Sequence, residues 1–179
     1  MKATILGTSQ MDNILQKVLD REKLDNLLDE ISQVLVENCE EVFVVPQEGV
    51  YFDVAMRYKE KGGKKVTGLV PSGDEKYRID HIKHNLDKVD HRIDLKDWYW
   101  LNGEIASKED VAIVLGYSGG VFSDLSFIKY HRKFLEKETK VIIFENTVSQ
   151  RLPPEFEKDI GDVSYITSPE ELERILKSY

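Results

Sequence analysis

Short apolar runs alternate with longer periodic segments along this chain. The strand candidates lie at residues 3–6, 42–45, 65–70, 111–115, 141–144 and 164–166, and those at 42–45, 111–115 and 141–144 are apolar throughout. Continuous apolar runs of this length are typical of strands that are covered on both faces. The alternating segment 91–95 allows one further short strand.

The segments between these runs have helical periodicity. The clearest one places Leu24, Leu27, Leu28, Ile31, Val34 and Leu35 on a single helical face. The same reasoning predicts helices over residues 48–61, 79–89, 97–105 and 121–137, and a last helix that begins at Ser168. The segment around Pro153 and Pro154 is predicted as a loop. This alternation predicts an α/β protein, a Rossmann-like open, mostly parallel sheet with helices on both faces, formed by residues 1–179 as a single domain.

Composition narrows the possible functions. The chain has 179 residues and a formal net charge of −8. An acidic chain lacks the basic surface that grips a nucleic-acid backbone, so we expect no DNA or RNA partner, whereas a small nucleotide remains compatible. A lone cysteine, Cys39, excludes an intrachain disulfide. No apolar run reaches the roughly 20 residues of a membrane helix, so we expect no membrane contact and a cytoplasmic location.

Turns at the carboxyl ends of the predicted strands are the candidate ligand site. In an open α/β sheet the ligand lies beyond these ends, where the strand order reverses. The turn with the most glycines spans residues 116–120 and connects a predicted strand to a predicted helix. In that position, free backbone amides can bind an anion. A tight turn that merely needs glycine is the alternative explanation. The predicted ligand-binding residues in these turns are Gly7, Thr8, Ser9, Glu48, Gly49, Gly116, Ser118, Gly119, Gly120 and Ser123.

The stretch from 110 to 124 (DVAIVLGYSGGVFSD) resembles the second motif of the SLOG superfamily, which includes LOG and DprA-like proteins. That motif is a strand, a glycine-rich turn and Gly-Thr-x-x-Glu at a helix start. Residues 47–71 are similar to the first family motif, a glycine turn, a helix and a second glycine-rich stretch. The resemblance implies a Rossmann-like fold, a small nucleotide-like ligand without a further cofactor, and a homodimer.

Departures from the family pattern indicate a divergent member. Val121 replaces the family threonine, and Asp124 replaces the glutamate. Leu101 stands in place of the arginine of a central Arg-Asn pair, of which Asn102 remains as a predicted ligand-binding residue. Gln47 and Glu48 occupy positions where glycines are usual. We therefore expect a binding protein that need not catalyse a reaction.

Asp124 is the candidate catalytic residue of the alternative function. LOG enzymes cleave the N-glycosidic bond of nucleoside monophosphates, and the resemblance implies that Asp124 would stabilise the developing positive charge. It could also serve as a nucleophile, as in nucleoside deoxyribosyltransferases. An acid at a helix start is also favoured by the helix dipole alone. A structural or regulatory subunit with a decayed site is a third possibility.

Two further clusters have simple interpretations. Asp80, His84, Asp87 and His91 would share one stripe of the helix predicted over 79–89, but their neighbours are solvent-facing, so we predict a solvated face and no metal. Trp98, Tyr99 and Trp100 are consecutive, so at least one of them lies off the core face of its helix. Packing in the core or in a dimer interface is the favoured explanation over base stacking.

Overall fold

A seven-stranded parallel sheet forms the centre of the molecule. The structure is a computed structural model that describes residues 1–15 and 20–179. Its strands are β1 (Lys2–Gly7), β2 (Glu41–Val44), β3 (Val66–Val70), β4 (His91–Asp94), β5 (Val111–Leu115), β6 (Lys140–Phe144) and β7 (Val163–Ile166). Their order across the sheet is β4-β3-β2-β1-β5-β6-β7, and every neighbouring pair is parallel. The predicted Rossmann-like α/β fold is confirmed.

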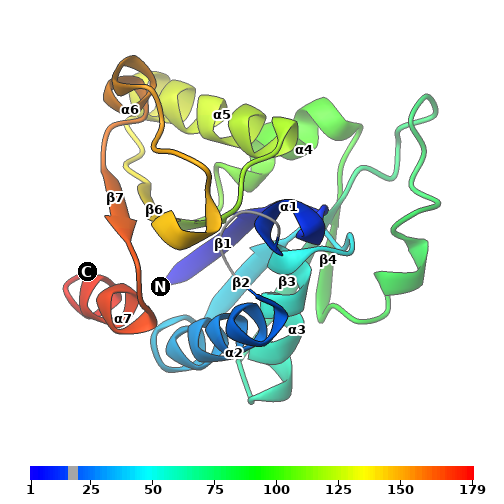
Figure 1. The fold of residues 1–179 in the computed structure, drawn as a ribbon. Helices are drawn as coiled ribbons and strands as arrows, with labels where there is room; N and C mark the ends of the chain where they lie inside the picture. The colour runs from blue at the N-terminus through cyan, green and yellow to red at the C-terminus, as the bar shows by residue number, and fades with distance from the viewer. Residues whose placement is uncertain (16–19) are drawn as a thin grey trace.

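Helices cover both faces of the sheet (Figure 1). They are α1 (Met11–Leu15), α2 (Arg21–Asn38), α3 (Val50–Glu60), α4 (Trp98–Ile105), α5 (Gly119–Leu135), α6 (Pro154–Ile160) and α7 (Pro169–Lys177). One apolar cluster joins α2, α3 and α7 to one face, and a second joins α4, α5 and α6 to the other. Because both faces are covered, β2, β3 and β5 are buried at every position, which explains why most of their residues are apolar.

Three parts of the chain differ from the expectations. The helix predicted over 79–89 is wrong: the segment consists of turns with one 3₁₀ turn, Lys83–Asn85. Among the apolar residues that predicted it, Ile82 is fully buried and Ile79, Leu86 and Val89 are only partly buried. Contacts across the fold hold the segment instead, because the buried Asn85 amide donates to the Pro46 carbonyl oxygen. The loop predicted around Pro153 and Pro154 contains α6, with Pro154 at its first position. Helix α1 has no counterpart in the prediction.

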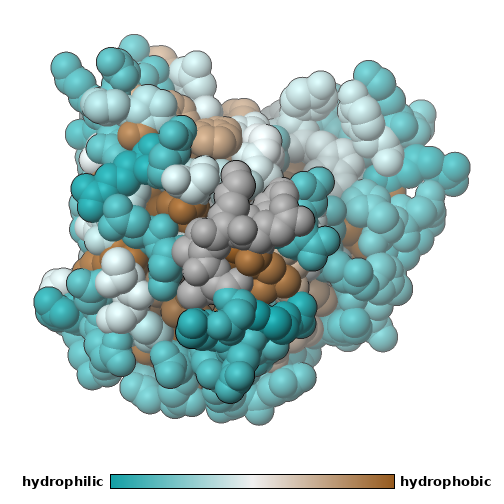
Figure 2. Space-filling model, viewed as in Figure 1, coloured by the Kyte–Doolittle hydropathy of each residue, from teal (hydrophilic) through white to brown (hydrophobic). Residues whose placement is uncertain are grey.

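The surface agrees with the acidic, polar composition. On the face seen in Figure 2, hydrophilic residues cover most of the molecule, and hydrophobic residues show in small areas between them. Among the described residues, no helix is long and apolar enough to cross a membrane.

Candidate functional site

A cavity of about 280 Å³ lies where the strand order reverses. The chain runs outward from β1 to β4 and then returns to the other side of β1 with β5, so the reversal falls between β1 and β5. An open α/β sheet binds ligands beyond the carboxyl ends of its strands at this point. The cavity is lined by Ile5, Leu6, Gly7, Ser9, Val45, Gln47, Tyr51, Trp98, Leu101, Asn102, Ile105, Ser118, Gly120, Val121 and Asp124.

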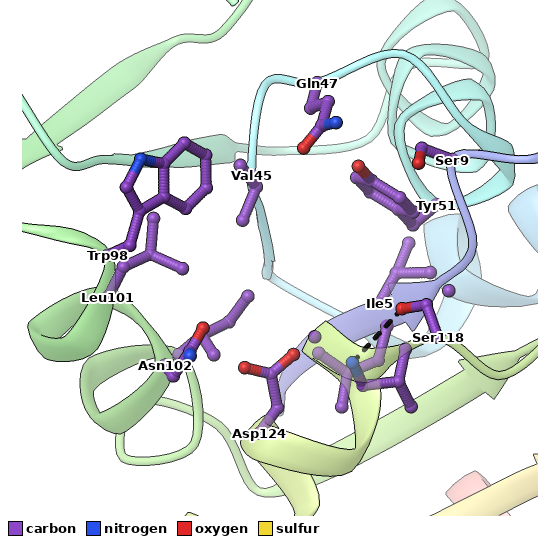
Figure 3. Close-up of a pocket in the computed structure, with 15 residues that line it drawn as sticks. Ile5, Ser9, Val45, Gln47, Tyr51, Trp98, Leu101, Asn102, Ser118 and Asp124 are labelled. Carbon is purple, nitrogen blue, oxygen red and sulfur yellow. Dashed lines mark hydrogen bonds between the residues drawn. The ribbon is translucent and has the colours of Figure 1, made fainter. Parts of the chain in front are cut away.

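The amino terminus of α5 forms one wall. The Ser118 side chain caps the helix by accepting a hydrogen bond from the Val121 N–H at 3.3 Å (Figure 3). Gly119 and Gly120 are exposed, and a Cβ placed on Gly119 would meet nothing within 4 Å. The first N–H groups of a helix lack intrahelical partners, so this open end suits an anionic group.

Asp124 lies one turn deeper, and its carboxyl points into the cavity (Figure 3). The residue is only 8% exposed, and its Oδ1 atom has no hydrogen-bond partner among the described residues. Burial raises its pKa well above the usual aspartate range, and the negative charge of Glu109 adds to the shift. The first turn of α5 contains no acidic residue, so the helix dipole does not explain Asp124.

Two aromatic side chains face each other across the cavity. Trp98 comes from the start of α4 and Tyr51 from the start of α3 (Figure 3). His81 stacks on Trp98, with ring centroids 5.6 Å apart and planes 17° apart. Burial raises the pKa of Tyr51, and the nearby Asp124 adds to the shift, so its phenol stays protonated near neutral pH. The two rings could enclose a flat, ring-shaped ligand.

The lower wall is apolar and carries no positive charge. Leu101 and Val121, which replace the family arginine and threonine, are both buried in the lining. The Asn102 amide donates to the Ser123 hydroxyl at 2.9 Å, which fixes the amide beside Asp124. None of the residues that line the cavity is lysine, arginine or histidine. An anion would therefore be held by backbone amides and hydroxyls rather than by side-chain cations.

The cavity brings together part of the predicted set. The predicted residues that line it are Gly7, Ser9, Asn102, Ser118, Gly120 and Asp124. Six others lie outside the lining: Thr8, Glu48, Gly49, Gly116, Gly119 and Ser123. Thr8 and Gly116 border a smaller hollow of about 170 Å³ behind the turns. Glu48 is largely exposed, and its Oε1 atom lies 3.0 Å from Nε2 of His84.

Sequence reasoning missed Gln47 and Tyr51 as lining side chains. Gln47 was noted only as a departure from the glycine pattern, and Tyr51 had no role. The available signal was position: both residues flank Gly49, the residue that opens α3 at the carboxyl end of β2. Trp98 was noted as an aromatic for packing, yet it also lines the cavity.

The stripe of Asp80, His84, Asp87 and His91 does not exist, because residues 79–89 are not helical. His84 contacts Glu48 instead. Within residues 1–15 and 20–179, no group of three histidine, cysteine or acidic side chains is arranged to hold a metal ion.

Comparisons with known proteins give matches in structure alone. No protein-family model and no curated protein matches the sequence. The molybdenum cofactor binding protein of the phototrophic bacterium Rippkaea orientalis matches with a TM-score of 0.67 at 18% identity, covering 99% of this chain and 95% of that one. The protein TM1055 matches with a TM-score of 0.71 at 18% identity, covering 99% of both chains. DNA processing protein A of Helicobacter pylori matches with a TM-score of 0.62 at 16% identity, covering 100% of this chain and 81% of that one.

These likenesses show the fold: this chain has the same Rossmann-like architecture as a DNA processing protein A, one of the protein groups to which the sequence resemblance points. They also correct one expectation. The Helicobacter pylori protein is described as binding single-stranded DNA, so excluding DNA from net charge alone was wrong. The physical reason is that net charge averages over the whole surface, whereas binding depends on the local distribution of charge.

Proposed function

We propose that this chain is a ligand-binding protein that holds a nucleotide or a related phosphorylated ligand at the carboxyl ends of β1, β2 and β5. The observation that carries this proposal is the buried Oδ1 atom of Asp124, which has no hydrogen-bond partner among the described residues and lies in a cavity next to the open amino terminus of α5. An unpartnered buried acceptor indicates a missing partner, and an open helix end suits a phosphate.

The two halves of the ligand would occupy different walls. The phosphate would lie over the amides of Gly119 and Gly120, and the ring would lie between Trp98 and Tyr51, within reach of Asp124. The Rippkaea orientalis relative is named for binding the molybdenum cofactor, so that compound belongs among the candidates.

A thermal-shift panel tests this proposal. It contains nucleoside monophosphates, cyclic nucleotides, ADP-ribose, NAD and the molybdenum cofactor. A ligand at 100 times its dissociation constant adds about 2.7 kcal/mol to the free energy of unfolding, which raises the Tm by roughly 5–10 °C in a chain of this size. A Val121→Trp variant, which fills the cavity, should lose the shift. No shift with any compound would contradict the proposal.

The alternative is an N-glycosidic-bond hydrolase or transferase that uses Asp124. The raised pKa of Asp124 opposes the carboxylate role in the free protein, because that role needs the ionised form. Measuring free base in the same wells decides the question. Base release that disappears in Asp124→Asn, while the thermal shift persists, would favour the enzyme.

We also propose that the protein is a homodimer. The specific observation is an aromatic face, defined as Tyr99 and Trp100 on α4 with Tyr130, Phe134 and Leu135 on α5. Tyr99 is 70% exposed and Phe134 is 67% exposed. The Tyr130 and Phe134 rings stack with centroids 6.2 Å apart. A groove of about 490 Å³ runs beside these side chains, with Gly103 and Phe127 in its lining.

The size of this face matches one side of a dimer. Aromatic side chains present about 150–250 Å² each, so five side chains that are half to two-thirds exposed leave on the order of 600 Å² in contact with water. The largest apolar patch of a monomer is about 300–600 Å², and a standard interface buries about 800 Å² per partner. Protruding rings and a groove on one face are self-complementary, which a two-fold interface requires.

Light scattering after size exclusion tests the dimer. The 20.7 kDa chain should elute at about twice its mass, and Phe134→Glu should elute as a monomer. Tyr77→Glu, which alters a 54% exposed tyrosine outside the aromatic face, is the matched control and should remain dimeric. A wild-type monomer at tens of micromolar would contradict the proposal.

A further inference from the structure

Asp124 is a polar side chain in the cavity with an oxygen atom that lacks a hydrogen-bond partner among the described residues. Its Oδ1 atom is buried and lacks a partner in the described parts of the chain, although the carboxyl points into the cavity (Figure 3). Buried polar groups in folded proteins are almost always paired, so this atom points to a bound ligand. The question is which protonation state of the acid meets that ligand.

The groups around Asp124 favour the neutral acid. The neighbouring lining from α4 and α5 is apolar, through Leu101 and Val121, and the polar neighbours, Asn102 from α4 and Tyr51 from α3, are uncharged. The titratable group that acts on Asp124 is Glu109, just before β5, and when Glu109 ionises its negative charge opposes ionisation of Asp124. Among the described residues, none that lines the cavity is a lysine, arginine or histidine.

We propose that Asp124 meets its ligand as a neutral carboxylic acid, which donates one hydrogen bond through its O–H and accepts one through its C=O. The ligand class that this pattern recognises is a heterocycle with an N–H donor beside an unprotonated ring nitrogen. This inference rests on the proposed function and deepens it. An ionised carboxylate only accepts hydrogen bonds, so it would instead select groups that only donate.

A neutral acid also avoids electrostatic repulsion between Asp124 and a phosphate bound at the amino terminus of α5. A phosphate over Gly119 and Gly120 would repel an ionised carboxylate one helical turn away, particularly with no cation in the lining. The uncharged form removes that repulsion. The ring nitrogen of the ligand can share the acid proton, which strengthens the hydrogen bond.

Two substitutions distinguish the neutral acid from the carboxylate. The probe is AMP, which carries an amino group beside an unprotonated ring nitrogen, and binding is measured by titration calorimetry. Asp124→Asn keeps one donor and one acceptor in the same shape, so its dissociation constant should stay within about threefold of wild type. Asp124→Ala removes both and should weaken binding at least tenfold, which is about 1.4 kcal/mol. Asp87→Asn changes an exposed carboxyl outside the lining and is the matched control.

The pH dependence of the unaltered protein is an independent readout. Between pH 7 and 9 the phosphate of AMP stays fully ionised, since its second pKa is about 6. Affinity of the wild type should fall with rising pH, approaching tenfold per pH unit above the pKa of Asp124, and affinity of Asp124→Asn should stay level. Glu109 has a pKa of about 8 and titrates in this window, so the series is repeated in Glu109→Gln.

Several outcomes would overturn the inference. Asp124→Asn binding as weakly as Asp124→Ala, or wild-type affinity that rises with pH, would assign the ionised carboxylate. Binding of IMP, which has no amino group, without binding of AMP would reject the ligand class and leave the proposed function standing. If no phosphorylated compound of the panel binds the wild type, the proposed function itself fails.

Discussion

The cavity and the aromatic face both use residues of α4 and α5, and they differ in the kind of interaction that each one lacks. The inner side of α4 supplies Leu101 and Asn102 to the cavity, and its outer side supplies Tyr99 and Trp100 to the aromatic face. The cavity buries a polar atom without a partner, whereas the aromatic face exposes apolar rings to water. A missing hydrogen bond indicates a small ligand, and missing apolar contact indicates another protein surface.

The two regions also differ in how much change they tolerate. The turns behind the cavity are tightly packed and depend on backbone conformations that favour glycine. The groove of the aromatic face is open and has room for added atoms. The same chemical substitution, glycine to alanine, should therefore have opposite effects in the two regions.

Gly49→Ala should give the largest effect. Gly49 has a φ of +154°, and a Cβ there would lie 2.8 Å from the Thr8 carbonyl oxygen. Strain and overpacking together should lower the free energy of unfolding by about 2–4 kcal/mol. The midpoint of urea unfolding measures this. A loss below 0.5 kcal/mol would show that the turn can adjust and that the region is less constrained than its contacts indicate.

The sequence was informative where periodicity alone decides structure. Buried strands such as Val111–Leu115 are continuous apolar runs because helices cover both faces. The helix predicted over 79–89 is absent for a physical reason: contacts across the fold through Ile82 and Asn85 hold this segment, rather than a helical apolar face. The two prolines, Pro153 and Pro154, predicted a loop where α6 lies, although proline is well suited to the first helical position.

The candidate site was predictable as a location and not as a set of side chains. Glycine turns at strand ends indicated the edge of the sheet at which the cavity lies, because the topology brings those ends together. The sequence does not reveal the direction in which each side chain points. Glu48 lies next to Gln47, yet Gln47 lines the cavity and Glu48 contacts His84. The burial of Asp124, on which the proposals depend, emerges only once α4 and α5 are packed together.

Glu109→Gln should give an intermediate effect that depends on pH. Glu109 is fully buried, and its ionisation affects groups in both regions. A negative charge on Glu109 raises the pKa of Asp124 in the cavity and acts in the same direction on the pKa of Lys137. Lys137 in turn donates to the carbonyl oxygen of Ser107 in the groove. Burial raises the pKa of Glu109 to about 8. A raised pKa in the folded state contributes stability that is present below about pH 4.5 and is lost as the pH rises through 8.

Glutamine carries no such proton, so the variant should avoid that loss. Its Tm relative to wild type should increase by a few degrees between pH 5 and pH 9. Differential scanning calorimetry at both values measures the change. The comparison is made in the Phe134→Glu background, so that self-association does not contribute. A Tm difference that is the same at both pH values would indicate that Glu109 is ionised throughout or is not coupled to folding.

Gly103→Ala should give the smallest effect, with the opposite sign to Gly49→Ala. Gly103 lies inside α4, and a Cβ there would meet Phe127 at 3.5 Å, an ordinary contact distance. Alanine is the better helix former by about 0.5–1 kcal/mol, so the Tm of the Phe134→Glu background should rise by roughly 1–4 °C. In the wild-type background the added methyl group narrows the groove, so the dimer dissociation constant from sedimentation equilibrium should increase. Stabilisation of the monomer together with weaker association would separate folding from docking on this face. A smaller dissociation constant would contradict this expectation. It would indicate that the aromatic rings of the partner contact the edge of the groove and do not contact Gly103.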